Sequence, residues 1–316
     1  TFWRYLKRNY NIDRPTKYCV IFNIWKDKLE SFSCTEFDTL DDALDEAKEL
    51  IEKYEITILP LHIMLGGEEY EDGVSITPDD IYKWSDANKT TPKTSAVAIE
   101  QTVEAFRPYV EEGREIVCFS ISSDMSTTVN VMKMAAAELE AEQLVTVIDS
   151  ASLSTGIGLL VVEAAIMAKE GKSGQDIAAR IEELKPNVRA SFVVDTLTYL
   201  YRGGRCSGLA AMAGGVLKLH PKLVVEHGKM RPDKKYRGKI ARVVMDYAKD
   251  MEESLKKAKK DRVFITYSGC DEAVIKEVQN YLEELHVFDE ILSTRAGGVI
   301  SSHCGPGTLG VLFIEE

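Results

Sequence analysis

Residues 115–149 read EIVCFSISSDMSTTVNVMKMAAAELEAEQLVTVID, and this stretch decides the fold class of the chain. An apolar strand is predicted over Glu115–Ile121, a helix over Thr127–Glu142 and a second strand over Leu144–Asp149. Strands and helices that alternate through short connections are typical of a parallel sheet covered by helices. The stretch therefore predicts an α/β domain.

The alternation extends on both sides of this stretch. Further helices are predicted over Ile99–Glu112 and Thr155–Glu170, and a strand over Ile56–Met64. Pro78 is expected to open another helix with Thr77 as its cap, since proline at the first helical position lacks only an N–H that has no partner there anyway. We place this α/β domain at residues 56–170.

The chain before residue 56 has a different pattern. Two strands, Tyr18–Trp25 and Leu29–Phe37, are separated by a short polar turn and predict a hairpin. Thr39 is expected to cap a helix over Leu40–Tyr54. We interpret residues 1–55 as a divergent N-terminal segment packed on the first domain.

The chain after residue 170 predicts a second, α+β domain over residues 171–316, with a largely antiparallel sheet. Its strands come in pairs, as around the turn His227-Gly228. The predicted elements are strands Ala190–Val194, Leu219–Glu226, Arg262–Ser268, Phe288–Thr294 and Gly310–Glu315, and helices Ile240–Lys260 and Asp271–Leu285.

Composition limits the function. The net charge of −12 over 316 residues argues against a general nucleic-acid-binding protein, which needs a basic surface. Six cysteines without a Cys-x-x-Cys pair indicate thiols in a reducing compartment, with no metal site. No apolar run reaches the roughly 18 residues that span a bilayer, and no signal peptide is evident, so we expect a cytoplasmic protein.

Hydroxyl groups at two places predict an anion-binding site. Thr94 and Ser95 are adjacent in a polar loop, and Ser122 and Ser126 follow the strand that ends near residue 121. In an open α/β sheet, ligands bind beyond the carboxyl ends of the strands, where hydroxyls and helix N–H groups can hold an oxyanion. The alternatives are an ordinary turn at Thr94 and a helix cap at Ser126.

Other polar residues lie near strand or helix ends. Asp149 ends a predicted strand, but the glycines that follow do not have dinucleotide-binding spacing. Arg205 follows a glycine pair and is suited either to an acidic group or to a helix end with a surface ion pair.

A basic tract covers residues 229–262, with 13 Lys and Arg against 6 Asp and Glu. It could dock a partner protein, an anionic headgroup or a membrane surface, or it could be the solvated face of a helix. We expect Lys234–Lys239, which includes Arg237, to lie in a turn, where the second interpretation fits less well.

His303 precedes Gly305-Pro306-Gly307 and is the histidine with the most suggestive surroundings. The turn would hold it near a ligand, or it could be a turn residue without a role. A hydrolase that pairs Ser126 with His303 is an alternative, but no Gly-x-Ser-x-Gly elbow is present and no third group is evident.

These motifs, taken in order, resemble the DegV family of bacterial fatty-acid-binding proteins. The resemblance covers residues 56–316 and rests on these stretches: Ile56–Leu61, Gly66–Gly73, Lys93–Ser95, Ile121–Ser126, Ile148–Ser150, Asp195–Leu197, Gly203–Arg205, Arg237–Lys239 and His303–Gly307. The sequence departs from the family pattern at Ala96–Ala98, Thr127 and Cys304.

The resemblance implies a lipid-binding protein that is not an enzyme and needs no cofactor. A long-chain fatty acid would lie between the two domains, with its carboxylate held by Thr94 and Ser126. His303 and Arg237 match positions implicated in presenting the carboxylate to a fatty acid kinase, which would form acyl phosphate. Ser95 and Ser122 would line the site, and Arg205 and Asp149 would support it or contact the partner.

The acyl chain would dominate the affinity, at roughly 0.8 kcal/mol for each buried CH₂. We expect it to lie against the helix Thr155–Ala168 and parts of Ala190–Leu200. Two alternatives remain: a serine-dependent esterase or acyl transferase, and a regulatory protein in which the lipid is structural and residues 1–50 recruit a partner.

Overall fold

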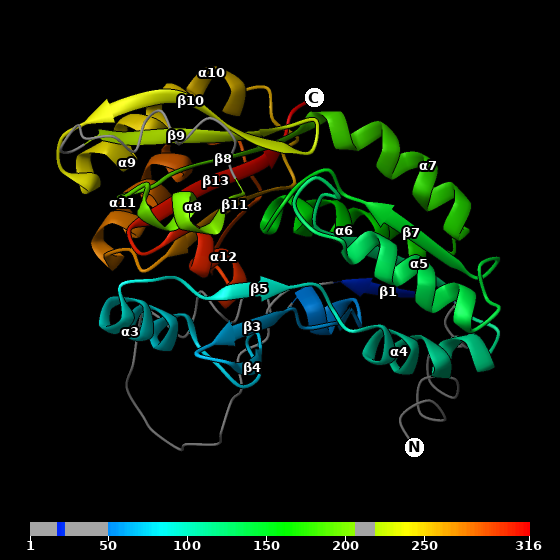
Figure 1. Ribbon diagram of the computed structural model, residues 1–316. Coiled ribbons are helices and arrows are strands. Elements are labelled where there is room, and N and C mark those ends of the chain that lie inside the picture. Colours follow the sequence, from blue (N-terminus) through cyan, green and yellow to red (C-terminus); the bar gives the residue numbers. More distant parts are fainter. Residues whose placement is uncertain (1–17, 23–49, 206–218) are drawn as a thin grey trace, which may run out of the picture.

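The computed structural model describes residues 18–22, 50–205 and 219–316 (Figure 1). Within these residues the strands form three sheets of four, six and three strands. The two larger sheets and their helices form the two halves of the molecule, and the small sheet lies below the six-stranded one in the view of Figure 1. The predicted fold class, a parallel α/β part and a largely antiparallel α+β part, is confirmed.

The four-stranded sheet is parallel throughout and has the order β2-β1-β6-β7. Its strands are β1 (Tyr18–Phe22), β2 (Thr57–Ile58), β6 (Glu115–Ser120) and β7 (Val145–Asp149). Alternate residues of β6 face opposite sides, as expected for a strand with a period of two. Ile116 and Cys118 pack with α4 (Ile99–Glu111) and α5 (Thr128–Glu138), whereas Val117 and Phe119 pack with α6 (Thr155–Lys169) and α7 (Gly174–Leu184).

The six-stranded sheet has the order β10-β9-β8-β13-β11-β12, and only its β11–β12 pair is parallel. One face is covered by α9, α10 and α11, which pack on Val311 and Phe313 of β13. The elements of this half are η1 (Lys185–Asn187), β8 (Val188–Val193), β9 (Leu219–Glu226), β10 (Lys229–Arg237), α9 (Ile240–Asp250), α10 (Glu252–Leu255), β11 (Arg262–Ser268), α11 (Glu272–Glu284), β12 (Glu290–Arg295) and β13 (Thr308–Ile314).

Helix α6 lies between the two large sheets and belongs to the core of both. It is apolar around most of its circumference, which is typical of a helix buried on all sides. A Cβ atom at Gly156 would lie 3.3 Å from Ala190 and 3.5 Å from Leu312, so the helix approaches the six-stranded sheet closely. The carboxylate of its Glu163 forms ion pairs with Lys259 (2.7 Å) and Arg262 (3.4 Å), and these connect α6 to that sheet.

The small sheet is antiparallel and has the order β4-β3-β5. Its strands are β3 (His62–Leu65), β4 (Glu68–Glu71) and β5 (Lys93–Ser95), and α3 (Pro78–Asn88) connects β4 to β5. Two short helices from the second half, α8 (Thr198–Gly203) and α12 (Gly298–Cys304), lie against one another, and α12 also contacts the small sheet and α3 (Figure 1).

Several predicted elements differ from the structure. The predicted strand Ile56–Met64 is two strands in different sheets, separated by residues 59–61, and the predicted helix Ile240–Lys260 breaks at Met251. The expectation that Lys234–Lys239 lies in a turn is wrong, because Lys234 to Arg237 belong to β10. That strand pairs with β9 through an irregularity between Pro232 and Lys235, which interrupts its alternation.

The structure describes only part of the predicted N-terminal segment. Tyr18–Phe22 is a strand, as predicted, and it lies between β2 and β6 in the parallel sheet. Residues 50–53 form the helical end of the predicted helix Leu40–Tyr54. The predicted second hairpin strand, Leu29–Phe37, and the rest of that helix lie outside the described residues.

Candidate functional site

Two residues predicted to bind a ligand, Thr94 and His303, are in contact. Thr94 lies in the middle of β5, and His303 lies near the end of α12, 209 residues further along the chain. The Oγ1 atom of Thr94 and the Nε2 atom of His303 are 2.9 Å apart, which is a hydrogen bond. The packing of α12 on the small sheet therefore brings the two side chains together.

His303 is held in a closely packed place. Its side chain is only 8% exposed, and within the described residues its Nδ1 atom has no hydrogen-bond partner. That atom faces Gly203 of α8, where any Cβ atom would overlap the imidazole ring. Burial, and to a smaller extent the positive charge of Arg205, lowers the pKa of His303 to about 4. The imidazole is therefore neutral at pH 7.

Arg205 lies just after α8 and stays exposed. Its Nη1 atom donates to the carbonyl of Gly203 at 2.8 Å, and Gly204 ends the helix with φ of 65°. Glycine favours this left-handed conformation, which is common at helix ends. The helix-end alternative for the Gly-Gly-Arg motif thus describes its local structure, and Arg205 also acts on His303 through its charge.

The surroundings predicted for His303 need a correction. His303 does not lie in a turn: it is the last residue but one of α12, and the Gly-Pro-Gly segment begins only after Cys304. Gly305 has φ of 76°, and a Cβ atom there would overlap the ring of Tyr199 in α8. The turn therefore packs closely against α8, and it is α12, not the turn, that positions His303.

The serine-rich loop after β6 is held by local bonds. The hydroxyl of Ser126 lies 2.8 Å from that of Thr128 and accepts the backbone N–H of Thr128 at 3.3 Å, at the start of α5. Ser122 is buried and donates to the carbonyl of Gly228 at 2.7 Å, which connects this loop to the β9–β10 turn of the other half. The carboxylate of Asp149 accepts the N–H groups of Ser123 (3.2 Å) and Ala151 (3.0 Å).

Two other predicted residues lie at strand ends. Ser95 ends β5 and is exposed, and it pairs across the sheet with His62. Arg237 ends β10, also exposed, and pairs with Leu219 of β9. Neither Ser95 nor Arg237 takes part in the hydrogen bond between Thr94 and His303.

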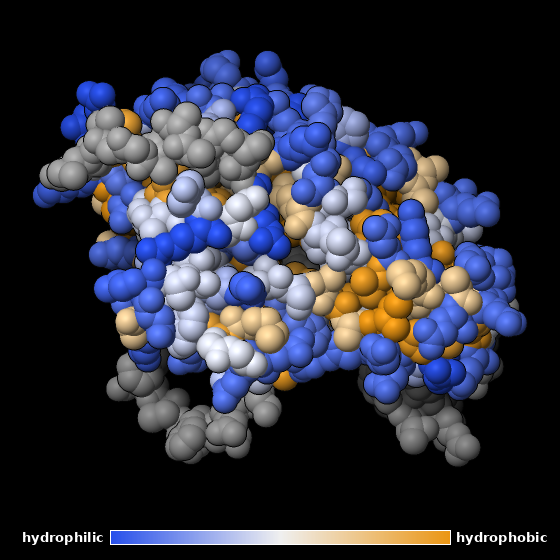
Figure 2. All heavy atoms as spheres, viewed as in Figure 1, coloured by the Kyte–Doolittle hydropathy of each residue, from blue (hydrophilic) through white to orange (hydrophobic). Residues whose placement is uncertain are grey.

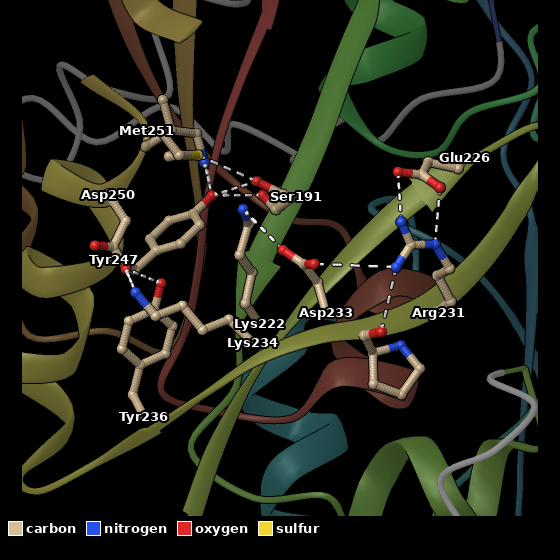
Figure 3. A network of polar contacts seen from close by, with 12 residues as sticks. Ser191, Lys222, Glu226, Arg231, Asp233, Lys234, Tyr236, Tyr247, Asp250 and Met251 are labelled. Carbon is tan, nitrogen blue, oxygen red and sulfur yellow. Dashed lines mark hydrogen bonds and ion pairs between the residues drawn. The ribbon is translucent and has the colours of Figure 1, made fainter. Parts of the chain in front are cut away.

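Much of the basic tract is paired with acidic neighbours (Figure 3). Arg231 binds Glu226 through two nitrogens, at 2.6 and 2.8 Å, and Lys222 lies 3.2 Å from Asp233. Lys234 forms an ion pair with the Asp250 carboxylate, which also accepts the hydroxyl of Tyr236 at 2.7 Å. These exposed pairs neutralise part of the tract, and their net contribution to stability is small.

Sequence reasoning missed one residue that bears on the site, Asp72. Its buried carboxylate accepts the first two N–H groups of α12 and so fixes the helix that carries His303. A second connection runs from the Tyr82 hydroxyl to Ser268 and from Ser268 to Ser301 of α12 at 3.0 Å. Asp72 lies in the stretch Gly66–Gly73 that supports the family resemblance, but no local signal shows its partners in α12 or the partner of Tyr82, which lie more than 180 positions away.

The face of the molecule shown in Figure 2 is hollowed near its centre, in the part of the view that lies between α12 and α6 in Figure 1. Apolar side chains gather over α4 and α5 on this face, and Met134 of α5 is 56% exposed. Within the described residues, no cluster of three or more His, Cys, Asp or Glu side chains could hold a metal ion. None of the helices in that part of the chain combines the length and apolar character required to cross a bilayer.

Comparison with known proteins places the chain among relatives of the same architecture. A family model described as "Uncharacterised protein, DegV family" matches residues 40–316. A DegV domain-containing protein of Clostridium acetobutylicum is 34% identical over 278 residues, which cover 87% of this chain and 97% of the relative.

Two solved structures are similar along nearly the whole chain. A DegV family protein from Thermus thermophilus, described by its fatty acid binding, is 27% identical with a TM-score of 0.80 and covers 95% of this chain and 100% of its own. A stearic-acid-binding protein from Eubacterium ventriosum is also 27% identical, with a TM-score of 0.76, and covers 95% and 98%.

Proposed function

This chain belongs to the DegV family, and on that premise we propose that it binds a long-chain fatty acid. The carboxylate is received by Thr94 and Ser126, and the acyl chain is buried between the parts formed by residues 56–170 and 171–316. The observation that carries the proposal is the hydrogen bond between Thr94 of β5 and His303 of α12. The fatty acids named for similar structures support the class of ligand.

Because His303 is neutral, its hydrogen bond can determine which way the hydroxyl hydrogen of Thr94 points. With the proton on Nε2, the imidazole donates to Oγ1 of Thr94, and the threonine hydroxyl keeps its own hydrogen for a ligand oxygen. This tautomer leaves only a lone pair at the unpartnered Nδ1 atom, and a buried acceptor without a partner is tolerated better than a buried N–H. His303 thus acts by orienting Thr94.

Ser126 supplies the second donor. It stands beyond the carboxyl end of β6, the edge at which open α/β sheets bind ligands. Its hydroxyl can accept from Thr128 and still donate its hydrogen to a carboxylate. Two hydroxyl donors offset part of the cost of removing a carboxylate from water, and the positive charge of Arg205 adds to them.

The remaining predicted site residues have supporting roles in this proposal. Ser122 and Asp149 shape the loop that carries Ser126, through the bonds of Ser122 to the β9–β10 turn and of Asp149 to backbone N–H groups. Ser95 and Arg237 are exposed at strand ends and would line the approach to the site.

The acyl chain lies in the apolar core between the large sheets. That core is continuous and joins Ile157 and Leu160 of α6 with Phe192, Val194 and Leu200 of the other half. Burial of a sixteen-carbon chain there offers on the order of 10 kcal/mol before ordering and association costs are subtracted. The tail therefore sets most of the affinity and the hydroxyls set its direction.

The protein presents the fatty acid to a fatty acid kinase and does not itself catalyse. The kinase would transfer the terminal phosphoryl group of ATP to a carboxylate oxygen and release ADP and acyl phosphate. The exposed cation at Arg237 suits an acidic partner surface or anionic headgroups. The alternative of a hydrolase has less support, because the Ser126 hydroxyl is bonded to Thr128 and the Nε2 atom of His303 to Thr94.

Mass spectrometry of an organic extract tests the proposal first. We expect a long-chain fatty acid to co-purify, and the delipidated protein to bind added palmitate or oleate. Thr94→Val keeps the shape of the side chain and removes the hydroxyl, so affinity for palmitate should fall at least about tenfold. Thr90→Val, an exposed change just before β5, is the matched control and should bind normally.

The result that counts against fatty acid binding is an extract without acyl species from a protein that also fails to bind both added acids. The kinase role is tested separately. The protein loaded with [1-¹³C]palmitate, mixed with a fatty acid kinase and ATP, should yield labelled acyl phosphate, and no product should form when either protein is omitted.

A further inference from the structure

The beginning of α12 is fixed by a carboxylate from a distant part of the chain. Asp72, just after β4, accepts the N–H of Gly298 through Oδ1 at 2.5 Å and the N–H of Val299 through Oδ2 at 2.8 Å. The first N–H groups of a helix have no partner within the helix, and a negative charge there also suits the helix dipole. Each oxygen of Asp72 therefore has its own backbone partner.

The approach of α12 to Asp72 is too close for a side chain at its first residue. A Cβ atom on Gly298 would lie 2.8 Å from Oδ1 of Asp72, 2.7 Å from Ile63 and 2.8 Å from Ile81. Asp72 itself is only 6% exposed. The contact is thus a tightly packed one, and it leaves the helix little freedom to slide along its axis.

The other end of the same helix is bound to the same sheet. His303 meets Thr94 of β5 at 2.9 Å, and β5 pairs with β3 through Thr94 and Ile63. Strand β3 in turn pairs with β4, which leads directly into Asp72. His303 follows Gly298 by five residues, or about 7.5 Å along a helix axis. One three-stranded sheet therefore holds α12 at both ends.

We infer that Asp72 is a positioning residue, which through α12 sets the place of the His303 imidazole and so the orientation of the Thr94 hydroxyl. The part of this inference that concerns a ligand rests on the proposed function. The part that concerns His303 and Thr94 stands on the geometry of the protein without a ligand.

The chemistry of Asp72 agrees with a positioning role. Within the described residues, the hydrogen bonds of its carboxylate are the two N–H groups of α12. Burial raises its pKa to about 6, and those two hydrogen bonds act in the opposite direction. Burying a carboxylate costs free energy unless its hydrogen bonds are kept. Moving the start of α12 away from Asp72 would therefore be unfavourable.

Asp72→Asn is the variant that tests the inference. The amide has the same shape but only one acceptor oxygen, and its NH₂ group would face a backbone N–H. In ligand-free protein labelled with ¹⁵N-histidine, the imidazole nitrogen signals of His303 should move or broaden. Affinity for [1-¹³C]palmitate should fall about tenfold, the loss expected for one charged hydrogen bond.

Asp79→Asn is the matched control. Asp79 is an exposed residue of the same part of the chain and binds Arg295, three residues before α12, at 2.5 Å. It removes one negative charge without touching the helix N–H groups, so the His303 signals and the affinity should stay as in the wild type.

Gly298→Ala perturbs the same contact from the helix side and covers the case in which Asp72→Asn does not fold. Its methyl group would press on the buried side chains of Asp72, Ile63 and Ile81, and the same His303 signals should move. The inference is overturned if His303 keeps its wild-type signals in the folded variants. Loss of palmitate binding by the wild type would instead contradict the proposed function, while the His303 signals would still test Asp72.

Discussion

Replacement of His303 by glutamine should change how stability depends on pH. The imidazole is buried, and its pKa is lowered from its ordinary value near 6.5 to about 4. The unfolded chain therefore binds a proton in the range between these values that the folded protein does not bind. The neutral histidine contributes fully to stability above pH 6.5, and this contribution is lost as the pH falls toward 4.

The size of the effect follows from the two pKa values. At pH 5 the histidine is almost fully protonated in the unfolded chain and mostly neutral in the folded protein. Moving from pH 7 to pH 5 should therefore lower the free energy of unfolding of the wild type by about 2 kcal/mol through this one group. Glutamine does not titrate, so the His303→Gln variant does not have this loss.

Urea unfolding of the delipidated proteins at pH 7 and pH 5 measures the effect. The stability difference between wild type and variant should shift by about 2 kcal/mol in favour of the variant at pH 5. Any constant cost of losing the imidazole cancels in this comparison, as do the other titrating groups. His286→Gln, a change of an exposed histidine, is the control for the substitution itself.

A stability difference that is the same at both pH values would refute the reasoning. It would mean that His303 takes up a proton in the folded protein as easily as in the unfolded chain. The packing against Gly203 and the hydrogen bond to Thr94 would then not hold a neutral imidazole in solution.

Three further predictions concern other described residues. Asp72→Asn should have the opposite pH trend, because burial raises the pKa of Asp72 to about 6. The stabilising contribution of Asp72 is complete below about pH 4 and is lost as the pH rises through 6. From pH 5 to pH 7 the wild type should therefore lose about 1 kcal/mol more of its free energy of unfolding than the variant, as measured by urea unfolding. Gly203→Ala places a methyl group on the His303 ring and should cost about 1–3 kcal/mol in the same assay, with altered imidazole NMR signals. Glu163→Gln removes the carboxylate that Lys259 and Arg262 share and should cost about 1–2 kcal/mol in thermal or urea unfolding, because Lys259 keeps Asp261 and Arg262 keeps Glu290 as partners.

The parallel half of the fold was predictable because its signals are local. β6 is a continuous apolar run, α5 and α6 have enough length to show helical composition, and β7 ends at Asp149, as predicted. Each of these elements is recognisable within a window of about fifteen residues. The predicted bounds consequently differ from the observed ones by only a few residues.

Elements whose stability comes from distant partners were missed. β10 has inward-facing apolar side chains only at Met230 and Tyr236, and the irregularity between Pro232 and Lys235 breaks the alternation that marks a strand. Pairing with β9, and not local pattern, makes it a strand. The omission of α7 is different, because a capping box at Ser173 was present in the sequence and was overlooked.

The site was predictable residue by residue but not as an arrangement. Thr94 and His303 could each be selected from their surroundings and from the family resemblance, yet nothing local places His303 on a helix. α12 has seven residues and begins with glycine, so its intrinsic helix propensity is low. Its first N–H groups are satisfied by Asp72, 226 residues earlier in the chain, which no window of sequence can show.

Because both depend on α12, the stability of the small sheet and the geometry of the site are coupled. The buried apolar cluster under this sheet consists of Ile63, Ile76, Ile81 and Val299, and Val299 belongs to α12. Three short strands and a helix bury too little apolar surface to be stable alone, so the sheet requires α12 as part of its core. The contacts that complete that core also bring His303 to Thr94. A change that loosens α12 should therefore appear at the Thr94 hydroxyl before it appears in the two large sheets, whose cores α6 joins independently.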